Sequence, residues 1–374
     1  MKKTPLVLDE LDVGILKVYQ NNPRRGNYVA SLKVSPSTAY TRLRARHKKG
    51  FCKPVVNIAW DYFGLRNNWF EAELGRGREK ETLEELENYK GLQFYSVGQS
   101  GVDVVWAALL DAPSSPAEPF FDEMRNEGLI EDYRFYRTGC HFKTQTDFSR
   151  YSPRTKKWNL GLPEPRCDCE KGEWVLDSEE LKERIEEEIK GRPKELYPAF
   201  DEPREFDVRD LFIISELSAK PEITYDAISK KMKTTSKKMG MTSQAVFYRA
   251  NKKFSGFRPD ENGVIISYAI VSPLTFIYQH RKIHVLEIPD YHKLNQLVFG
   301  TIELPFVTEV SAVLNRPELI LQTVLPEDTN PFLGLPKSII SAQRTTSLDT
   351  AISRSLDVRL EKCFDEETGK WSFY

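Results

Sequence analysis

The stretch SPSTAYTRLRARHKKGF, residues 35–51, decides how the N-terminal part of the chain is interpreted. Ser35 is a suitable helix N-cap, Pro36 suits the first helical turn, and Gly50 suits the position after the last turn. The pattern therefore predicts a helix over about 36–49. The stretch contains no acid but is rich in cations, namely Arg42, Arg44, Arg46, Lys48 and Lys49. Packing alone does not require this charge, which indicates a polyanionic partner.

The segments around the basic helix are expected to form further short elements. Residues 8–19 predict a first helix with Leu11 and Ile15 on one face, and residues 27–34 predict a short second helix. Residues 51–60 follow as a strand. Three helices and a strand, the third helix being basic, predict a winged helix-turn-helix.

The pattern changes after this unit. Strands are predicted at 68–75, 92–98, 103–111 and 131–139, and helices at 80–91 and 116–128. The order βαββαβ predicts a ferredoxin-like domain with its helices on one face of an antiparallel sheet.

The same order is then repeated along the chain. Residues 206–217 resemble 8–19 in pattern, and 241–257 end in Gly-Phe as 35–51 do. A second βαββαβ is predicted with strands at 282–289, 306–314, 318–326 and 357–364, and with helices at 291–300 and 336–344. The predicted fold class is α+β, a tandem repeat of winged helix-turn-helix plus ferredoxin-like domains. The expected boundaries are 1–66 and 67–160 for the first pair, 161–204 for an acidic helical linker, and 205–265 and 266–374 for the second pair.

Composition indicates an ordinary globular protein. The chain has 374 residues, 40% hydrophobic content, 29% charged content and a net charge of −1. It contains no apolar run long enough for a membrane span, and five irregularly placed cysteines do not suggest a disulfide framework. We expect a cytoplasmic, chromosome-associated protein with no membrane partner. The cations are local: no Asp or Glu occurs from Val13 to Lys53.

These residues resemble the leucine-responsive regulator/AsnC family of transcription factors. The family opening Leu-Asp-x-x-Asp-x-x-Ile-Leu is matched at residues 8–16, and its Ser-Pro-Ser-Thr helix start is matched at residues 35–38. A Gly-x-x-Asp hairpin is matched near Gly98, Gly101 and Asp103. The resemblance is good over 8–140 and rests on pattern alone over 206–374.

The resemblance implies a transcription regulator rather than an enzyme. Family members bind duplex DNA as dimers and often bind amino acids, so a tandem chain resembles a fused dimer with two different recognition helices. A homodimer or higher oligomer of the whole chain is a further expectation, and an archaeal source fits the family. No cofactor is expected, apart from a small-molecule effector such as an amino acid. The effector residues implied by the hairpin are Gly98, Gly101 and Asp103, although these residues also suit a simple tight turn.

The predicted DNA contacts lie on both basic helices and on one turn. In the first unit we expect base contacts from the outer face of the helix and phosphate contacts from its cations. The predicted set is Arg24, Arg25, Ser35, Ser37, Thr38, Tyr40, Thr41, Arg42, Arg44, Arg46, Lys48 and Lys49, with Thr242, Ser243, Gln244, Tyr248, Arg249 and Lys252 in the second unit.

Two alternatives stay open on the sequence. Sirohaem decarboxylases share this two-domain architecture and would use His and Arg in the second domain, for which His141, His280, His284 and His292 are available. A chromosome protein that coats DNA without sequence preference is the other. A metal site is a weak hypothesis from Cys140, His141, Cys167 and Cys169, because no Cys-x-x-Cys knuckle occurs.

Overall fold

The structure is a computed structural model of the chain. It describes most of both halves and a few short segments between them. The described residues are 8–21, 32–48, 54–99, 102–143, 148, 151–155, 157–158, 166–168, 173–175, 205–236, 239–253, 265–270, 280–290, 293–294, 297–298, 301, 304, 306–314, 316–325, 328, 330–333, 335, 337–338 and 340–374.

The N-terminal unit contains two described helices and one strand, α1 (Glu10–Asn21), α2 (Pro36–Lys48) and β1 (Pro54–Ile58). Leu8, Ile15, Ala39 and Leu43 form its small core, to which the later hairpin residue Tyr151 contributes. The predicted first and third helices and the strand are therefore confirmed. Most of the predicted second helix lies outside the described residues.

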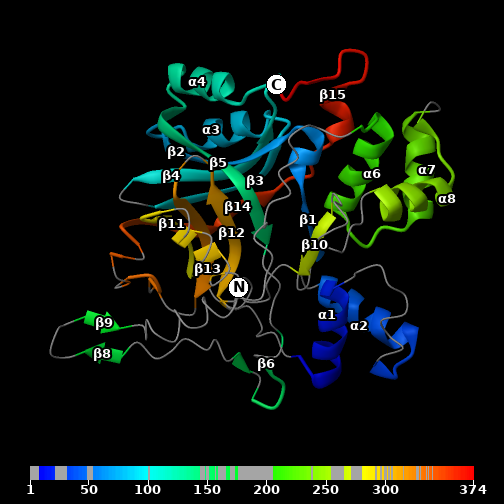
Figure 1. The fold of residues 1–374 in the computed structure, drawn as a ribbon, viewed down its shortest axis with the longest axis horizontal. Coiled ribbons are helices and arrows are strands. Elements are labelled where there is room, and N and C mark those ends of the chain that lie inside the picture. The colour runs from blue at the N-terminus through cyan, green and yellow to red at the C-terminus, as the bar shows by residue number, and fades with distance from the viewer. Residues whose placement is uncertain are drawn as a thin grey trace.

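A four-stranded antiparallel sheet follows, with β2 (Arg66–Leu74), β3 (Leu92–Gln99), β4 (Asp103–Asp111) and β5 (Ile130–Lys143) in the order β5-β2-β4-β3. Helices α3 (Glu79–Leu86) and α4 (Glu118–Asn126) lie on one face of this sheet (Figure 1). Phe70 and Phe121 stack with ring centroids 4.0 Å apart between sheet and helix. All six elements predicted between 68 and 139 are present, and the α+β class is confirmed.

The second half begins with α6 (Val208–Ala219), α7 (Tyr225–Thr235) and α8 (Ser243–Tyr248), which continues as a π-helical turn at Arg249–Lys253. Its strand β10 (Ile265–Ile270) pairs antiparallel with β1 of the first half. In Figure 1, α6, α7 and α8 lie to the right of this ribbon, and α1 and α2 lie at its lower end.

The sheets of the two halves close into one barrel. Strands β11 (His280–Glu287), β12 (Val307–Val313), β13 (Glu318–Leu325) and β14 (Ala342–Ser355) have the order β14-β11-β13-β12. β12 pairs with β5 and β14 pairs with β3, which gives a closed antiparallel barrel of eight strands. No sheet edge is left open in the barrel, so it offers no edge for pairing with another chain.

Two predictions for the last part of the chain are wrong. The helix expected at 336–344 is replaced by turns and by the start of β14, a segment whose Thr345 and Thr346 favour strand. The strand expected at 357–364 instead contains a 3-10 turn at Leu360–Lys362. That turn packs on α6, where the Leu360 N–H donates to Ser215 Oγ at 3.0 Å.

Short hairpins follow each half of the barrel. They are β6 (Tyr151–Ser152) with β7 (Lys157–Trp158), β8 (Arg166–Asp168) with β9 (Glu173–Val175), and β15 (Phe364–Asp365) with β16 (Lys370–Trp371). A 3-10 turn at Trp60–Phe63 connects β1 to β2. Most of the predicted acidic helical linker, residues 161–204, lies outside the described residues, which there include only β8 and β9.

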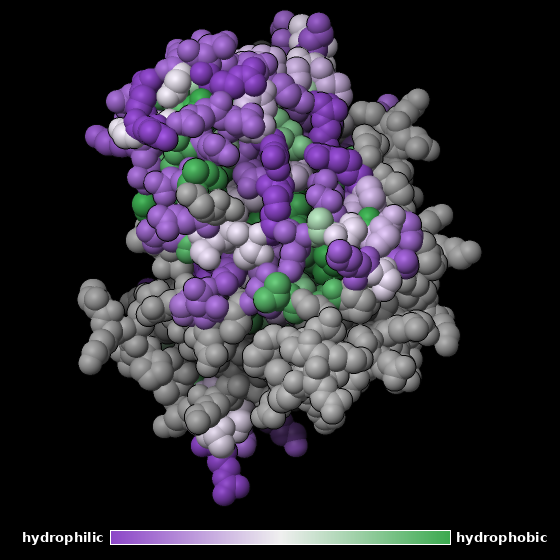
Figure 2. All heavy atoms as spheres, turned by 90° about the vertical axis from the view of Figure 1, so that its left-hand side faces the viewer, coloured by the Kyte–Doolittle hydropathy of each residue, from purple (hydrophilic) through white to green (hydrophobic). Residues whose placement is uncertain are grey.

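The surface is polar over the helical layer of the first half. Figure 2 shows a mainly hydrophilic upper region, on the side where Figure 1 places α3 and α4, with scattered hydrophobic patches below it. None of the described helices is long and apolar enough to cross a membrane.

Candidate nucleic-acid interface

Helix α2 is positioned by its own N-terminus and by two buried side chains. The Thr38 N–H donates to Ser35 Oγ at 3.1 Å, so Ser35 acts as the N-cap that the sequence predicted. Ala39 and Leu43 are buried and fix which side of the helix faces the core. The opposite side is therefore available to a partner.

Among the side chains of α2 that the structure describes, the outward ones include polar groups and the guanidinium of Arg44. The exposed ones are those of Ser37, Thr38, Tyr40, Thr41, Arg44 and Ala45, and Tyr40 is 64% exposed. Arg44 makes no ion pair with any residue that the structure describes. A helix face of hydroxyls, a phenol and a guanidinium can both donate to phosphates and contact base edges.

The Arg42 side chain is partly exposed and also contacts the start of the first helix. Its Nη1 atom lies 2.5 Å from Asp9 Oδ2 and 3.2 Å from Asp12 Oδ1. The hydrogen bond to Asp9 is the main interaction that raises the pKa of Arg42. The two aspartates also cap α1 reciprocally, since the Asp12 N–H donates to Asp9 Oδ1 at 2.8 Å and the Asp9 N–H donates to Asp12 Oδ2 at 3.3 Å. The phosphate contact predicted for Arg42 remains a prediction, but the structure gives this side chain an intramolecular role that the sequence did not.

Arg249 of the second half makes the same contacts. Its Nη1 lies 2.7 Å from Asp207 Oδ1 and 2.6 Å from Asp210 Oδ1, and the two aspartates form a reciprocal capping box on α6. Asp210 is fully buried. One guanidinium on a third helix thus bridges two capping carboxylates of a first helix in both halves.

Helix α8 begins as α2 does and exposes different residues. Thr242 is its N-cap and accepts from the Ala245 N–H at 3.2 Å. Of the predicted contacts, Thr242, Gln244 and Tyr248 are exposed and Ser243 is half-buried. Phe247, which the sequence analysis did not select, is 52% exposed beside Tyr248 at 65%. In the sequence, Phe247 directly precedes the predicted contact Tyr248, and this adjacency could have indicated that Phe247 lies on the same exposed face.

Several predicted contacts cannot be placed. Arg24, Arg25 and Lys49 lie outside the described residues. The backbones of Arg46 and Lys48 belong to α2 and that of Lys252 to the π-helical turn, but their side chains are outside the description.

In the hairpin that was expected to bind an effector, the packing of the strands explains why residue 98 is a glycine. A Cβ atom at this position would lie 2.6 Å from the carbonyl oxygen of Ser347 and 2.9 Å from Thr346 Cγ2. Gly98 therefore permits β14 to approach β3 and close the barrel. Asp103 is exposed and accepts from Gln99 Nε2 at 3.1 Å, while Gly101 lies outside the described residues.

The barrel interior contains an aromatic stack and a polar network. Trp106 lies 5.7 Å from Tyr136 in a stacked arrangement and 6.1 Å from Trp69 edge-on, as centroid distances. Tyr136 Oη donates to Glu71 Oε2 at 2.7 Å, and Arg344 from the second half contacts both groups. Burial, followed by Glu71, raises the pKa of Tyr136 to about 12. The network joins the two halves across the barrel.

A shallow hollow opens near this network. It is mixed in charge, with lining residues Glu71, Glu73, Val102, Val104, Asp132, Tyr133, Arg134 and Arg344. Since Arg344 is already paired with Glu71, the hollow has no excess of cations to attract a polyanionic small molecule.

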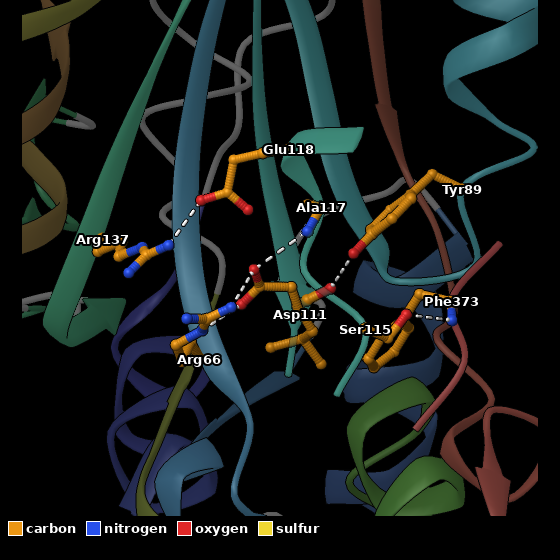
Figure 3. Close-up of polar contacts among 9 residues, drawn as sticks. Arg66, Tyr89, Asp111, Ser115, Ala117, Glu118, Arg137 and Phe373 are labelled. Atoms are coloured by element: carbon orange, nitrogen blue, oxygen red, sulfur yellow. Dashed lines mark hydrogen bonds and ion pairs between the residues drawn. The ribbon is translucent and has the colours of Figure 1, made fainter. Parts of the chain in front are cut away.

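A second polar cluster anchors the C-terminus on the first half (Figure 3). Arg66 holds the buried Asp111 with two contacts of 2.7 Å, and Asp111 accepts from the Ala117 N–H at the start of α4. Tyr89 donates to the carbonyl oxygen of Leu110 at 2.9 Å. The Phe373 N–H donates to Ser115 Oγ at 3.2 Å. Each polar group links one backbone segment to another, so this cluster supports the fold.

The histidines do not form a site among the described residues. His284 is fully buried, its ring nitrogens lie 3.0 Å from Thr345 Oγ1 and 2.9 Å from Thr323 Oγ1, and burial lowers its pKa to about 3. His280 is half-buried at the start of β11. The structure describes the backbone of His141 in β5 but not its side chain, and His292 is not among the described residues.

The metal hypothesis gains no support from the described part of the chain. No three His, Cys, Asp or Glu residues are grouped there as metal ligands. The strands at Cys140 and Cys167 are described without their side chains, and Cys169 lies outside.

The comparisons with known proteins bear on the fold. No protein-family profile and no curated protein matches the sequence. The siroheme decarboxylase NirDL matches with a TM-score of 0.52 at 12% identity, covering 91% of each chain. Its complex with an iron-uroporphyrin III analogue matches at 0.54 and 10% identity, covering 94% of each chain. E. coli AsnC matches at 0.29 and 15% identity over 35% of this chain and 92% of its own.

These matches correct one expectation. The chain was expected not to be an enzyme, but the matches that cover nearly its whole length are to an enzyme, so that expectation is contradicted. The likeness to AsnC-type regulators is partial and extends over about a third of the chain.

Proposed function

We propose that this chain binds duplex DNA in a sequence-dependent manner, with α2 and α8 as its two recognition helices. The observation that carries the proposal is the outward face of α2, on which Ser37, Thr38, Tyr40, Thr41 and Arg44 are all exposed and none is acidic. A major groove accepts an α-helix, and these side-chain types donate to phosphates and base edges.

The matching contacts of Arg42 and Arg249 support a second, equivalent unit. Each fixes its recognition helix against the first helix of its own half. The two units then act as a fused pseudo-dimer, a tandem arrangement in a single chain. Because α2 and α8 expose different residues, the preferred DNA site is asymmetric.

The test is selection from a random duplex pool, followed by fluorescence anisotropy over a salt series. We expect selected duplexes to bind more tightly than scrambled ones, with affinity that falls steeply as salt rises. Equal affinity for selected and scrambled duplexes would refute the sequence dependence and leave a non-specific coating protein. Absence of binding at low salt would refute DNA binding itself.

A siroheme-decarboxylase-like activity is the second candidate, and the full-length likeness to NirDL favours it. Its substrate would be an iron tetrapyrrole with several carboxylates. The mixed-charge hollow has no excess of cations that would favour such a substrate, and His284 is buried inside the second half.

Absorption titration with iron-uroporphyrin III tests the second candidate directly. A shifted, saturable Soret band and loss of substrate carboxylates by mass spectrometry would establish it. An unchanged spectrum at micromolar protein would remove it. The DNA experiments use protein to which no tetrapyrrole has been added, so the two candidate functions are measured independently.

A further inference from the structure

Helix α8 presents two large aromatic side chains where α2 presents a phenol and a hydroxyl. The alignment of the two helices follows from contacts. Arg42 and Arg249 each bridge the capping aspartates of their own half, and each follows three residues after a fully buried one, Ala39 or Val246. The two positions after that buried residue point outward in both helices. They hold Tyr40 and Thr41 in α2.

In α8 the two outward positions are Phe247 and Tyr248, which are 52% and 65% exposed. Phe247 touches Tyr225 edge-on, with centroids 5.5 Å apart, and the rest of its ring faces solvent. Exposing a large apolar ring beside another aromatic is unfavourable in water unless a partner covers both.

Two polar side chains that follow the aromatic pair are engaged within the protein. Arg249 is held by two aspartates. Asn251, at the place of Arg44 in α2, donates to Tyr225 Oη at 2.8 Å and to the carbonyl oxygen of Phe247 at 2.8 Å. At the aligned positions the exposed surface of α8 is therefore more apolar than that of α2.

We propose that Phe247 and Tyr248 read thymine through its C5-methyl group in the major groove, so that α8 prefers a thymine-rich half-site while Arg44 of α2 reads guanine. This inference rests on the proposed function. The thymine methyl is the one apolar group that the bases offer in the major groove, and aromatic side chains contact it. Lys233, exposed in the last turn of α7 in the same unit, supplies positive charge toward a polyanion.

Replacing thymine by uracil removes the methyl and changes no hydrogen bond, which makes the test specific. The selected duplex is synthesised with thymine or with uracil and titrated by anisotropy. Each contacted methyl is expected to contribute about a fourfold difference in Kd. The Phe247→Ala/Tyr248→Ala double variant should bind the thymine duplex more weakly and lose most of the preference for thymine over uracil. Its salt slope should not change, because no cation is removed.

Leu333→Ala is the matched control, since Leu333 is an equally exposed apolar residue at 58% on a different part of the second half. It should leave both titrations unchanged. An identical thymine-to-uracil ratio in wild type and double variant would overturn the inference while DNA binding stands. Failure of selection to yield any binding duplex would overturn the proposed function as well. Concentration-dependent association of the wild type that the double variant lacks, measured by sedimentation, would assign the aromatic face to a second copy and also overturn the inference.

Discussion

Arg344 on β14 reaches Glu71 on β2, with Nη1 3.0 Å from Oε2, although the two residues are 273 positions apart in sequence. The Glu71 side chain is only 11% exposed, and Tyr136 donates to the same carboxylate. The ion pair joins the two halves of the barrel, so its loss reports directly on their association.

Arg344→Ala should therefore destabilise the chain. Glu71 would lose its cation and Tyr136 one of its two partners. Because Arg344 is 40% exposed, we expect a loss of about 1–2 kcal/mol rather than the larger cost of a fully buried pair. Urea denaturation followed by circular dichroism measures it. Arg354→Ala, which removes a surface pair with Glu87, should cost less. Equal effects would show that the barrel pair is no stronger than a surface contact.

Arg42→Ala and Arg44→Ala should separate folding from DNA binding. Removing Arg42 takes one cationic partner from Asp12, which is 2% exposed, and should cost about 1–2 kcal/mol of stability. Removing Arg44 should leave stability unchanged, weaken DNA binding and relax the discrimination at the guanine that it is proposed to read. Thermal melts and anisotropy on the same preparations measure both quantities. The assignment fails if Arg44→Ala unfolds the unit or if Arg42→Ala leaves the melting temperature unaltered.

How far the sequence predicts this molecule depends on the range of the interactions involved. Local patterns predicted α1, α2 and every element from β2 to β5, because caps, turns and alternation act over a few residues. Barrel closure was not predicted, since β5–β12 and β3–β14 pairings depend on strands far apart in the chain. The same reason explains Arg42: its partners Asp9 and Asp12 are about thirty residues away. The repeated Asp-x-x-Asp at the start of each first helix was a signal that could have found the pairing.

Gly98→Ala should destabilise the barrel through steric overlap, whether or not an effector binds. The added Cβ would meet the backbone oxygen of Ser347 at 2.6 Å, and a backbone atom in a paired strand cannot move aside cheaply. Overpacking of this kind costs about 1–3 kcal/mol. Gln99→Ala, at the exposed neighbouring position, should be nearly neutral. A Gly98→Ala protein with wild-type stability that no longer responds to an amino acid would instead support the effector role implied by the family resemblance.

Phe373→Ala should cost far more than Tyr374→Ala. Phe373 is fully buried between Tyr89 and Trp371, with centroids 5.9 Å and 5.8 Å away, and its backbone pairs with Lys90 and Ser115. A buried Phe replaced by Ala loses about 3–5 kcal/mol. Tyr374 is 52% exposed and should lose little. Comparable melting temperatures for the two variants would show that the C-terminal segment does not stabilise the first half.

The raised pKa of Tyr136 predicts a loss of stability at alkaline pH. Burial, and to a smaller extent the negative charge of Glu71, raises this pKa to about 12, whereas the pKa of a tyrosine in an unfolded chain is near 10. The contribution is fully present below the unfolded pKa. It is lost as pH rises from about 10 to about 12, because the unfolded chain releases the phenolic proton first. Urea midpoints measured across that interval should fall less steeply for Tyr136→Phe than for wild type. Only the slopes are compared, since the variant also loses its hydrogen bond to Glu71 at neutral pH. Parallel slopes would mean that Tyr136 titrates as an ordinary exposed tyrosine and that the barrel interior admits water.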